Sequence, residues 1–203
     1  MCWNASVSLN TYIFGLFATV FSYVNRNVNG ITSTQSLIFY QSFIIMQLIE
    51  YFIWSKTFPN KLLSQLALLV IYFQPIFNIT QINTRPELIP YLLFAYIAFV
   101  GIVYTFIIPL NTVDFSTVPS KNGHLSWNWL NINIYIIFIW HAFLSSRWII
   151  DKMYSVFIFT TVFLIITLIL YKDTNTWGSL WCWAINIVSF YLVLSVFYDE
   201  FCI

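Results

Sequence analysis

A single carboxylate interrupts a long apolar run that begins near Leu37. Glu50 stands in the segment MQLIEYFIW (46–54), three residues after Gln47 and four before Trp54. Because these positions recur at helical spacing, their side chains share one face of a helix. A carboxyl group with little water around it can exchange protons or hold a cation. Glu50 and Gln47 are therefore candidates for a proton or cation site, and a structural polar clamp is the alternative.

Two further segments carry polar stripes at the same helical spacing. Ser179, Cys182 and Asn186 follow one another at intervals of three and four, and His141 belongs to a weaker stripe. Polar atoms on a membrane helix turn inward, because lipid cannot satisfy them. We therefore expect these stripes to face Glu50 and to line one shared polar pathway.

Depth in the membrane separates the candidate residues. At a rise of about 1.5 Å per residue, Glu50 lies about 6 Å below the interface marked by Trp54. Cys182 lies about 7 Å inside Trp177 on the same side, whereas His141 lies about 16 Å deep. A direct contact between Glu50 and His141 is not expected, although a chain of water molecules could join them. The residues expected to converge near one mouth of the bundle are Cys2, Gln47, Glu50, Ser179 and Cys182.

Cysteine chemistry is the second use that these residues allow. Cys182 could act as a nucleophile, but that requires a nearby base, and His141 is too deep to serve. Cys2, Glu50 and Cys182 have side chains that a metal ion accepts, although they come from three separated segments. We predict no metal and no cofactor, and we keep those three residues as the candidate ligands. Whether the protein is an enzyme stays open.

The composition places these residues in a membrane protein. Of the 203 residues, 60% are hydrophobic and only 7% are charged, against about 25% charged residues in a soluble domain. A soluble protein so poor in charge would aggregate, so we expect the apolar surface to face a lipid bilayer. The net charge of +1 and the lack of a Lys or Arg cluster argue against a nucleic-acid partner.

Seven apolar segments have lengths near the roughly 20 residues that cross a bilayer. We therefore predict an all-α fold, an integral membrane bundle of seven transmembrane helices that forms one domain over residues 1–203. The eight Lys and Arg residues divide four against four between the two sides, so orientation is not predicted. The predicted spans are Val7–Tyr23, Leu37–Trp54, Leu62–Phe77, Leu88–Pro109, Leu130–Ile149, Tyr154–Tyr171 and Trp177–Tyr198.

Two local features predict contacts between or beside the spans. Small residues four apart in the first span, Gly15 and Thr19 among them, favour close helix packing. Arg147 and Asp151, four apart at the end of the fifth span, should form an exposed ion pair at the membrane surface.

Three stretches together resemble an uncharacterised family of small multi-span membrane proteins of bacteria and giant DNA viruses. They are the opening MCWNAS, the second-span MQLIEYFIW and the later SLWCW. Members of that family open Met-Cys-Phe/Trp-Ser, and Asn4 stands where the early Ser is expected. The family carries no known activity, but the resemblance implies that its scattered motif residues form one site. The matching residues are Cys2, Gln47, Glu50, Trp54, Ser179, Trp181 and Cys182.

Three functions fit these observations. The first is a small transporter or channel for protons, ions or small solutes, with Glu50 as its protonatable group. The second is a membrane-embedded enzyme that uses Cys182 with Glu50, and the third is a structural or accessory membrane protein, for instance of a virion. A homo-oligomer is left open, and neither the substrate nor the particular membrane is predicted. The residues of the expected polar pathway are Gln47, Glu50, His141, Ser179, Cys182 and Asn186.

Overall fold

Seven α-helices dominate the computed structural model, which describes residues 4–25, 30–108, 110–179 and 181–201. Within these residues the remaining regular structure is a two-stranded hairpin and short helical turns. The predicted all-α bundle is thereby confirmed. The helices are α1 (Ala5–Val24), α2 (Thr34–Ser55), α3 (Asn60–Ile79), α4 (Ile89–Ile102), α5 (Ile134–Ile150), α6 (Tyr154–Tyr171) and α7 (Trp181–Phe201).

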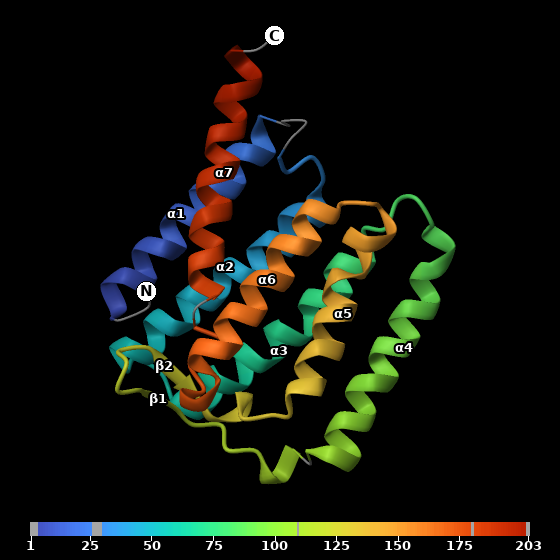
Figure 1. Cartoon of the computed structure of the whole chain (residues 1–203). Coiled ribbons are helices and arrows are strands. Elements are labelled where there is room, and N and C mark those ends of the chain that lie inside the picture. The colour runs from blue at the N-terminus through green and yellow to red at the C-terminus, as the bar shows by residue number, and fades with distance from the viewer. Residues whose placement is uncertain (1–3, 26–29, 109, 180, 202–203) are drawn as a thin grey trace.

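The helices alternate in direction along the bundle. Figure 1 shows α1 beginning in the lower half of the view and α7 ending at the top, with each successive helix reversing direction. Helix α4 stands at one edge of the bundle, whereas α1 and α7 lie at the opposite edge. This arrangement is the one that a chain crossing a membrane an odd number of times would adopt.

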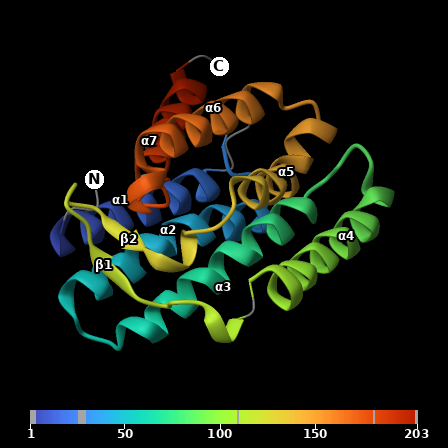
Figure 2. The same cartoon turned by 60° about the horizontal axis from the view of Figure 1, so that its bottom comes forward.

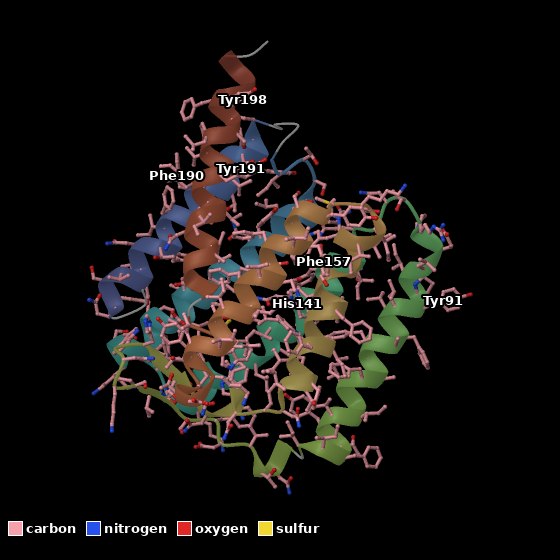
Figure 3. The ribbon with its side chains drawn as sticks, viewed as in Figure 1. Tyr91, His141, Phe157, Phe190, Tyr191 and Tyr198 are labelled. Atoms are coloured by element: carbon pink, nitrogen blue, oxygen red, sulfur yellow. The ribbon has the colours of Figure 1, made fainter. Side chains whose placement is uncertain are left out.

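Much of the outer surface is apolar, as a lipid-facing surface must be. Tyr91 on α4 and Phe190 on α7 project away from the bundle (Figure 3) and are exposed. Among the described helices, five segments are long and apolar enough to cross a membrane, which fits an integral membrane protein. The five segments are Ala5–Val24, Thr34–Ser55, Asn60–Ile79, Pro86–Ile107 and Tyr154–Thr174.

The remaining two predicted spans are helices whose starts differ from the prediction. Helix α5 begins at Ile134 rather than at residue 130, because residues 128–130 form a separate 3-10 turn and the side chain of Asn133 caps the helix. Helix α7 begins at Trp181, and turns occupy residues 177–179. Helix α5 has 17 residues, and the apolar stretch of α7 is described over Ala184–Tyr198. The crossing of a membrane by these two helices stays a prediction.

Small side chains bring α1 close to α2, as their spacing predicts. Helix α1 buries its small residues, and a Cβ added at Gly15 would lie 3.0 Å from Cγ1 of Ile44 on α2. Gln41 of α2 donates a hydrogen bond of 2.6 Å from Nε2 to Oγ1 of Thr19. The two helices thus combine close packing with a polar contact, which suits association in lipid.

The long connection between α4 and α5 is folded. Helix α4 continues into a π-helical turn (Val103–Ile107), after which strand β1 (Thr117–Pro119) pairs antiparallel with β2 (Leu125–Trp127). Figure 2 shows this hairpin lying across the end of the bundle, next to the C-terminal end of α2 and the N-terminal end of α3. The hairpin therefore covers the end of the bundle toward which Glu50 lies on α2.

The predicted pair of Arg147 and Asp151 forms at the opposite end, but it is not exposed. Nε of Arg147 lies 3.6 Å from Oδ2 of Asp151, and the two side chains are only 16% and 8% exposed. The chain between α3 and α4 folds over the pair, and Thr84 donates hydrogen bonds from its backbone N and its Oγ1 to Asp151. Arg147 also donates to Oε1 of Gln81, which accepts a second bond from Ser36 of α2. This polar network joins α2 and α5 to the turn that follows α3.

The acidity of Asp151 provides a test of this network. Burial alone would raise the pKa of Asp151, but hydrogen bonds from Thr84 and Asn83 and the charge of Arg147 outweigh burial and hold the pKa below its ordinary value of 3.8. A carboxyl group with a depressed pKa stabilises the fold above its ordinary pKa, and that stability is lost as the pH falls through the pKa of the folded state.

We predict that Asp151→Asn lowers the free energy of unfolding at pH 7 by about 1–3 kcal/mol. The difference from the wild type should shrink as the pH is lowered below about 4. Unfolding in detergent micelles, followed by circular dichroism, measures both effects. The exposed Asp173 provides the control, since Asp173→Asn should change the free energy by less than about 0.5 kcal/mol. Equal losses in the two variants would contradict the role of Asp151.

Candidate binding cavity

Glu50 and Gln47 lie in the interior of the bundle. Each side chain is only 2% exposed, although α2 is an otherwise apolar helix. Both residues line a cavity of about 90 Å³, to which α3 adds a third polar side chain, that of Gln74. Nε2 of Gln74 donates to the backbone oxygen of Ser42 at 3.3 Å, which ties α3 to α2 beside the cavity. The structure therefore brings two of the predicted pathway residues together.

The wall of this cavity is built from segments far apart in the sequence. Helices α2, α3 and α5 line most of the cavity, and the π-helical turn after α4 closes one side. The residues that follow β2 and those that precede α7 close the end nearest the hairpin. The apolar and aromatic lining residues are Phe43, Met46, Leu68, Ile71, Tyr72, Tyr104, Trp129, Leu130, Ile132, Ile136, Ile137, Trp140, Trp177 and Ile185.

Glu50 sets the sign of the charge in the cavity. Among the described lining residues it is the one side chain that can carry a formal charge, and the other polar side chains, Gln47 and Gln74, are neutral amides. An amide can donate to a carboxylate and can equally accept from a protonated carboxyl group. The arrangement can therefore accommodate Glu50 in either protonation state, as a proton or cation site requires.

Two tryptophans bring hydrogen-bond donors to the cavity wall. Trp129 and Trp177 are each 5% exposed, and within the described residues their indole Nε1 atoms have no hydrogen-bond partner. A buried donor without a partner costs about 1–3 kcal/mol, so such groups normally meet water or a ligand. A cavity of about 90 Å³ is large enough for a few water molecules, which occupy about 30 Å³ each in the liquid.

The hairpin is fastened to the bundle on both of its strands. Asn60 of α3 donates from Nδ2 to the backbone oxygen of Thr117 at 2.7 Å and accepts from the backbone N of Thr117 at 2.9 Å. On the other strand, Nε1 of Trp127 donates to Oγ of Ser179 at 2.9 Å, and that hydroxyl donates to the backbone oxygen of Leu125. Since the chain runs from β2 directly into the cavity wall at Trp129, we call the hairpin the cap of the cavity.

His124 lies within this cap and is buried there. Burial is the main reason that the pKa of His124 is lowered to about 4. The imidazole is therefore neutral at pH 7, and the cap adds no positive charge at this position.

Three of the predicted pathway residues have other neighbours. Ser179 bonds to the hairpin, and Nδ2 of Asn186 donates to Oγ1 of Thr11 on α1 at 3.4 Å. Nε2 of His141 lies 3.0 Å from Oγ1 of Thr161, and Figure 3 shows His141 on α5 where it faces α6. These three residues are not among the residues that line the cavity.

The predicted cysteines cannot be placed in this geometry. Cys2 lies outside the described residues, and Cys182 belongs to α7 while its side chain lies outside them. Among the described side chains, no group of three His, Cys, Asp or Glu residues is placed to hold a metal ion.

Two wall residues, Gln74 and Trp129, were not singled out as binding residues by their sequence pattern. Gln74 is a polar residue inside an apolar span, so the rule that identified Glu50 could have found it. Trp177 belongs to the stretch TWGSLWCW (176–183), whose tryptophans can stack a quaternary amine but are more typical of belt and packing residues. Trp129 carries a weaker signal still, because a tryptophan near a helix end is typical of the membrane interface. The place of both tryptophans in the wall depends on the fold of the hairpin and of the turns before α7.

Comparisons with models of known protein families, with curated proteins and with solved structures found no match. The resemblance to small multi-span membrane proteins of bacteria and giant DNA viruses stays a prediction.

We predict that Asn60→Ala loosens the cap. Losing both bonds to Thr117 should lower the local free energy of opening by about 1–2 kcal/mol, which corresponds to roughly tenfold faster hydrogen exchange. Exchange of the amides in residues 117–127, measured by mass spectrometry, tests this. Asn111→Ala is the matched control, since Asn111 is exposed in the same connection. Unchanged exchange in the Asn60 variant would show that other contacts hold the hairpin.

Proposed function

We propose that this protein is a multi-pass membrane transporter or channel for protons, ions or small solutes, with Glu50 as its protonatable group. The observation that carries the proposal is the placement of Glu50, which is 2% exposed and lines a cavity inside an apolar bundle. Carboxyl groups within membrane bundles are costly, and those that persist commonly mark ion or proton paths.

Glu50 would work by exchanging one positive charge for another. In the proposed cycle, the carboxyl group carries a proton while no cation is bound. When a cation enters, the carboxylate forms and the proton leaves to water. Gln47, one turn earlier on α2, can hydrogen-bond the carboxyl group in both states.

The two ends of the cavity are closed by different elements. Toward the hairpin, Asn60 and Ser179 form hydrogen bonds with the two strands, and Leu125, Trp127 and Leu130 are buried in the main apolar core. Toward the other end, α2 and α5 pack through Phe39, Leu144 and Trp148, and the network of Arg147 lies beyond them. Both ends are therefore closed by packed side chains, and passage through the protein would need a motion of the hairpin and a second motion between α2 and α5.

Flux into proteoliposomes tests the proposal. Wild-type protein under an imposed pH gradient and membrane potential should carry protons faster than empty liposomes, and Glu50→Gln should reduce the flux to that of empty liposomes. Glu87→Gln is the matched control, because Glu87 is an exposed acid before α4. Its flux should equal that of the wild type.

Two results would contradict the proposal. One is wild-type flux no greater than that of empty liposomes, and the other is equal flux in the wild type and the Glu50 variant. Circular dichroism and gel filtration of each variant show whether a lost flux reflects a lost fold.

A further inference from the structure

The charge of the cavity favours a cation. The described wall contains the carboxyl group of Glu50 and no Lys, Arg or His side chain. Placing an anion beside a carboxylate in surroundings poor in water is strongly unfavourable, whereas a cation gains from the same proximity. The ligand best suited to this wall therefore carries a positive charge.

The walls favour an organic cation over a metal ion. Hard metal ions take six or more oxygen ligands, whereas the polar side chains beside Glu50 are the amides of Gln47 and Gln74. Most of the wall is apolar, and aromatic rings attract ammonium groups through their negative faces. The aromatic residues of the wall are Phe43, Tyr72, Tyr104, Trp129, Trp140 and Trp177.

These rings come from different segments and are partly fixed by one another. The rings of Tyr72 and Tyr104 meet edge to face, with centroids 5.3 Å apart and planes at 89°. Trp129 packs in the same way against Trp127 of the hairpin, with centroids 5.5 Å apart. Fixed rings lower the cost of ordering the site when a ligand binds.

The volume limits the size of the cation. A cavity of 150 Å³ accepts benzene, so a cavity of about 90 Å³ suits a compact group of roughly two to five heavy atoms. Ammonium ions up to tetramethylammonium fall within that range, and tetraethylammonium is too large. A methylammonium ion would leave room for about one water, whose oxygen could accept from an indole N–H of Trp129 or Trp177.

We infer that the cavity binds a small ammonium ion, from methylammonium to tetramethylammonium in size, between the carboxylate of Glu50 and the aromatic wall. This inference rests on the proposed function, because it names the substrate class of the same cavity. The carboxyl group of Glu50 releases its proton to water as the ammonium group takes its place.

Equilibrium dialysis of the purified full-length protein in detergent micelles, with radiolabelled methylammonium, tests the inference. We expect saturable binding that tetramethylammonium displaces and that tetraethylammonium and acetate do not. Glu50→Gln should weaken binding at least about tenfold, and Trp129→Leu should weaken it about fivefold to thirtyfold, since it removes one aromatic face. Glu87→Gln should bind as the wild type does.

The outcomes separate this inference from the proposed function. Absence of saturable binding would overturn it, as would displacement by acetate or tetraethylammonium equal to that by tetramethylammonium. If Glu50→Gln does not fold, unchanged affinity in Trp129→Leu overturns it. Proton flux without methylammonium binding would contradict the ammonium site but would agree with the proposed transport. Methylammonium binding without any proton flux would support the ammonium site and contradict the proposed transport.

Discussion

The burial of one carboxyl group is the constraint on which the rest of this structure depends. Glu50 lies among apolar side chains, where an ionised carboxylate without compensation would be very costly. Polar groups accordingly gather at that level of the bundle, with Gln47 on the same helix and Gln74 on α3. The cavity that these residues line gives Glu50 room for a few water molecules while the outside of the bundle stays apolar. The rest of the interior can then pack as an ordinary membrane bundle does.

The two ends of α2 have different surroundings. At one end Ser36 joins the buried network of Arg147 and Asp151, which fixes three elements to one another. Nearer the other end the cavity is covered by a short hairpin. Hydrogen bonds with Asn60 and Ser179 and the buried side chains of β2 hold this hairpin against the bundle. Entry of a small cation at this end would therefore require the hairpin to move.

The sequence predicted the helices well and the shape of the cavity poorly, for physical reasons. Apolar runs of about 20 residues are strong local signals, and they placed α1 to α4 and α6 close to where the structure has them. The burial of Glu50 followed from the cost of placing an acid against lipid. The hairpin was missed because its strands are only three residues each, and its contacts with Asn60 and Ser179 join distant parts of the chain. The burial of Asp151 was missed for the same reason, since it depends on how the chain folds between α3 and α4.

Infrared difference spectroscopy can follow the protonation of Glu50 as a ligand binds. If the cavity takes a small ammonium ion as proposed, the carboxyl group gives up its proton when the ion occupies the cavity. In the wild-type protein, adding methylammonium should remove the C=O stretching band of a protonated carboxyl group and produce carboxylate bands. The same addition to Glu50→Gln should leave that spectral region unchanged. A carboxyl band that methylammonium does not alter, or an identical difference spectrum in the variant, would contradict the account.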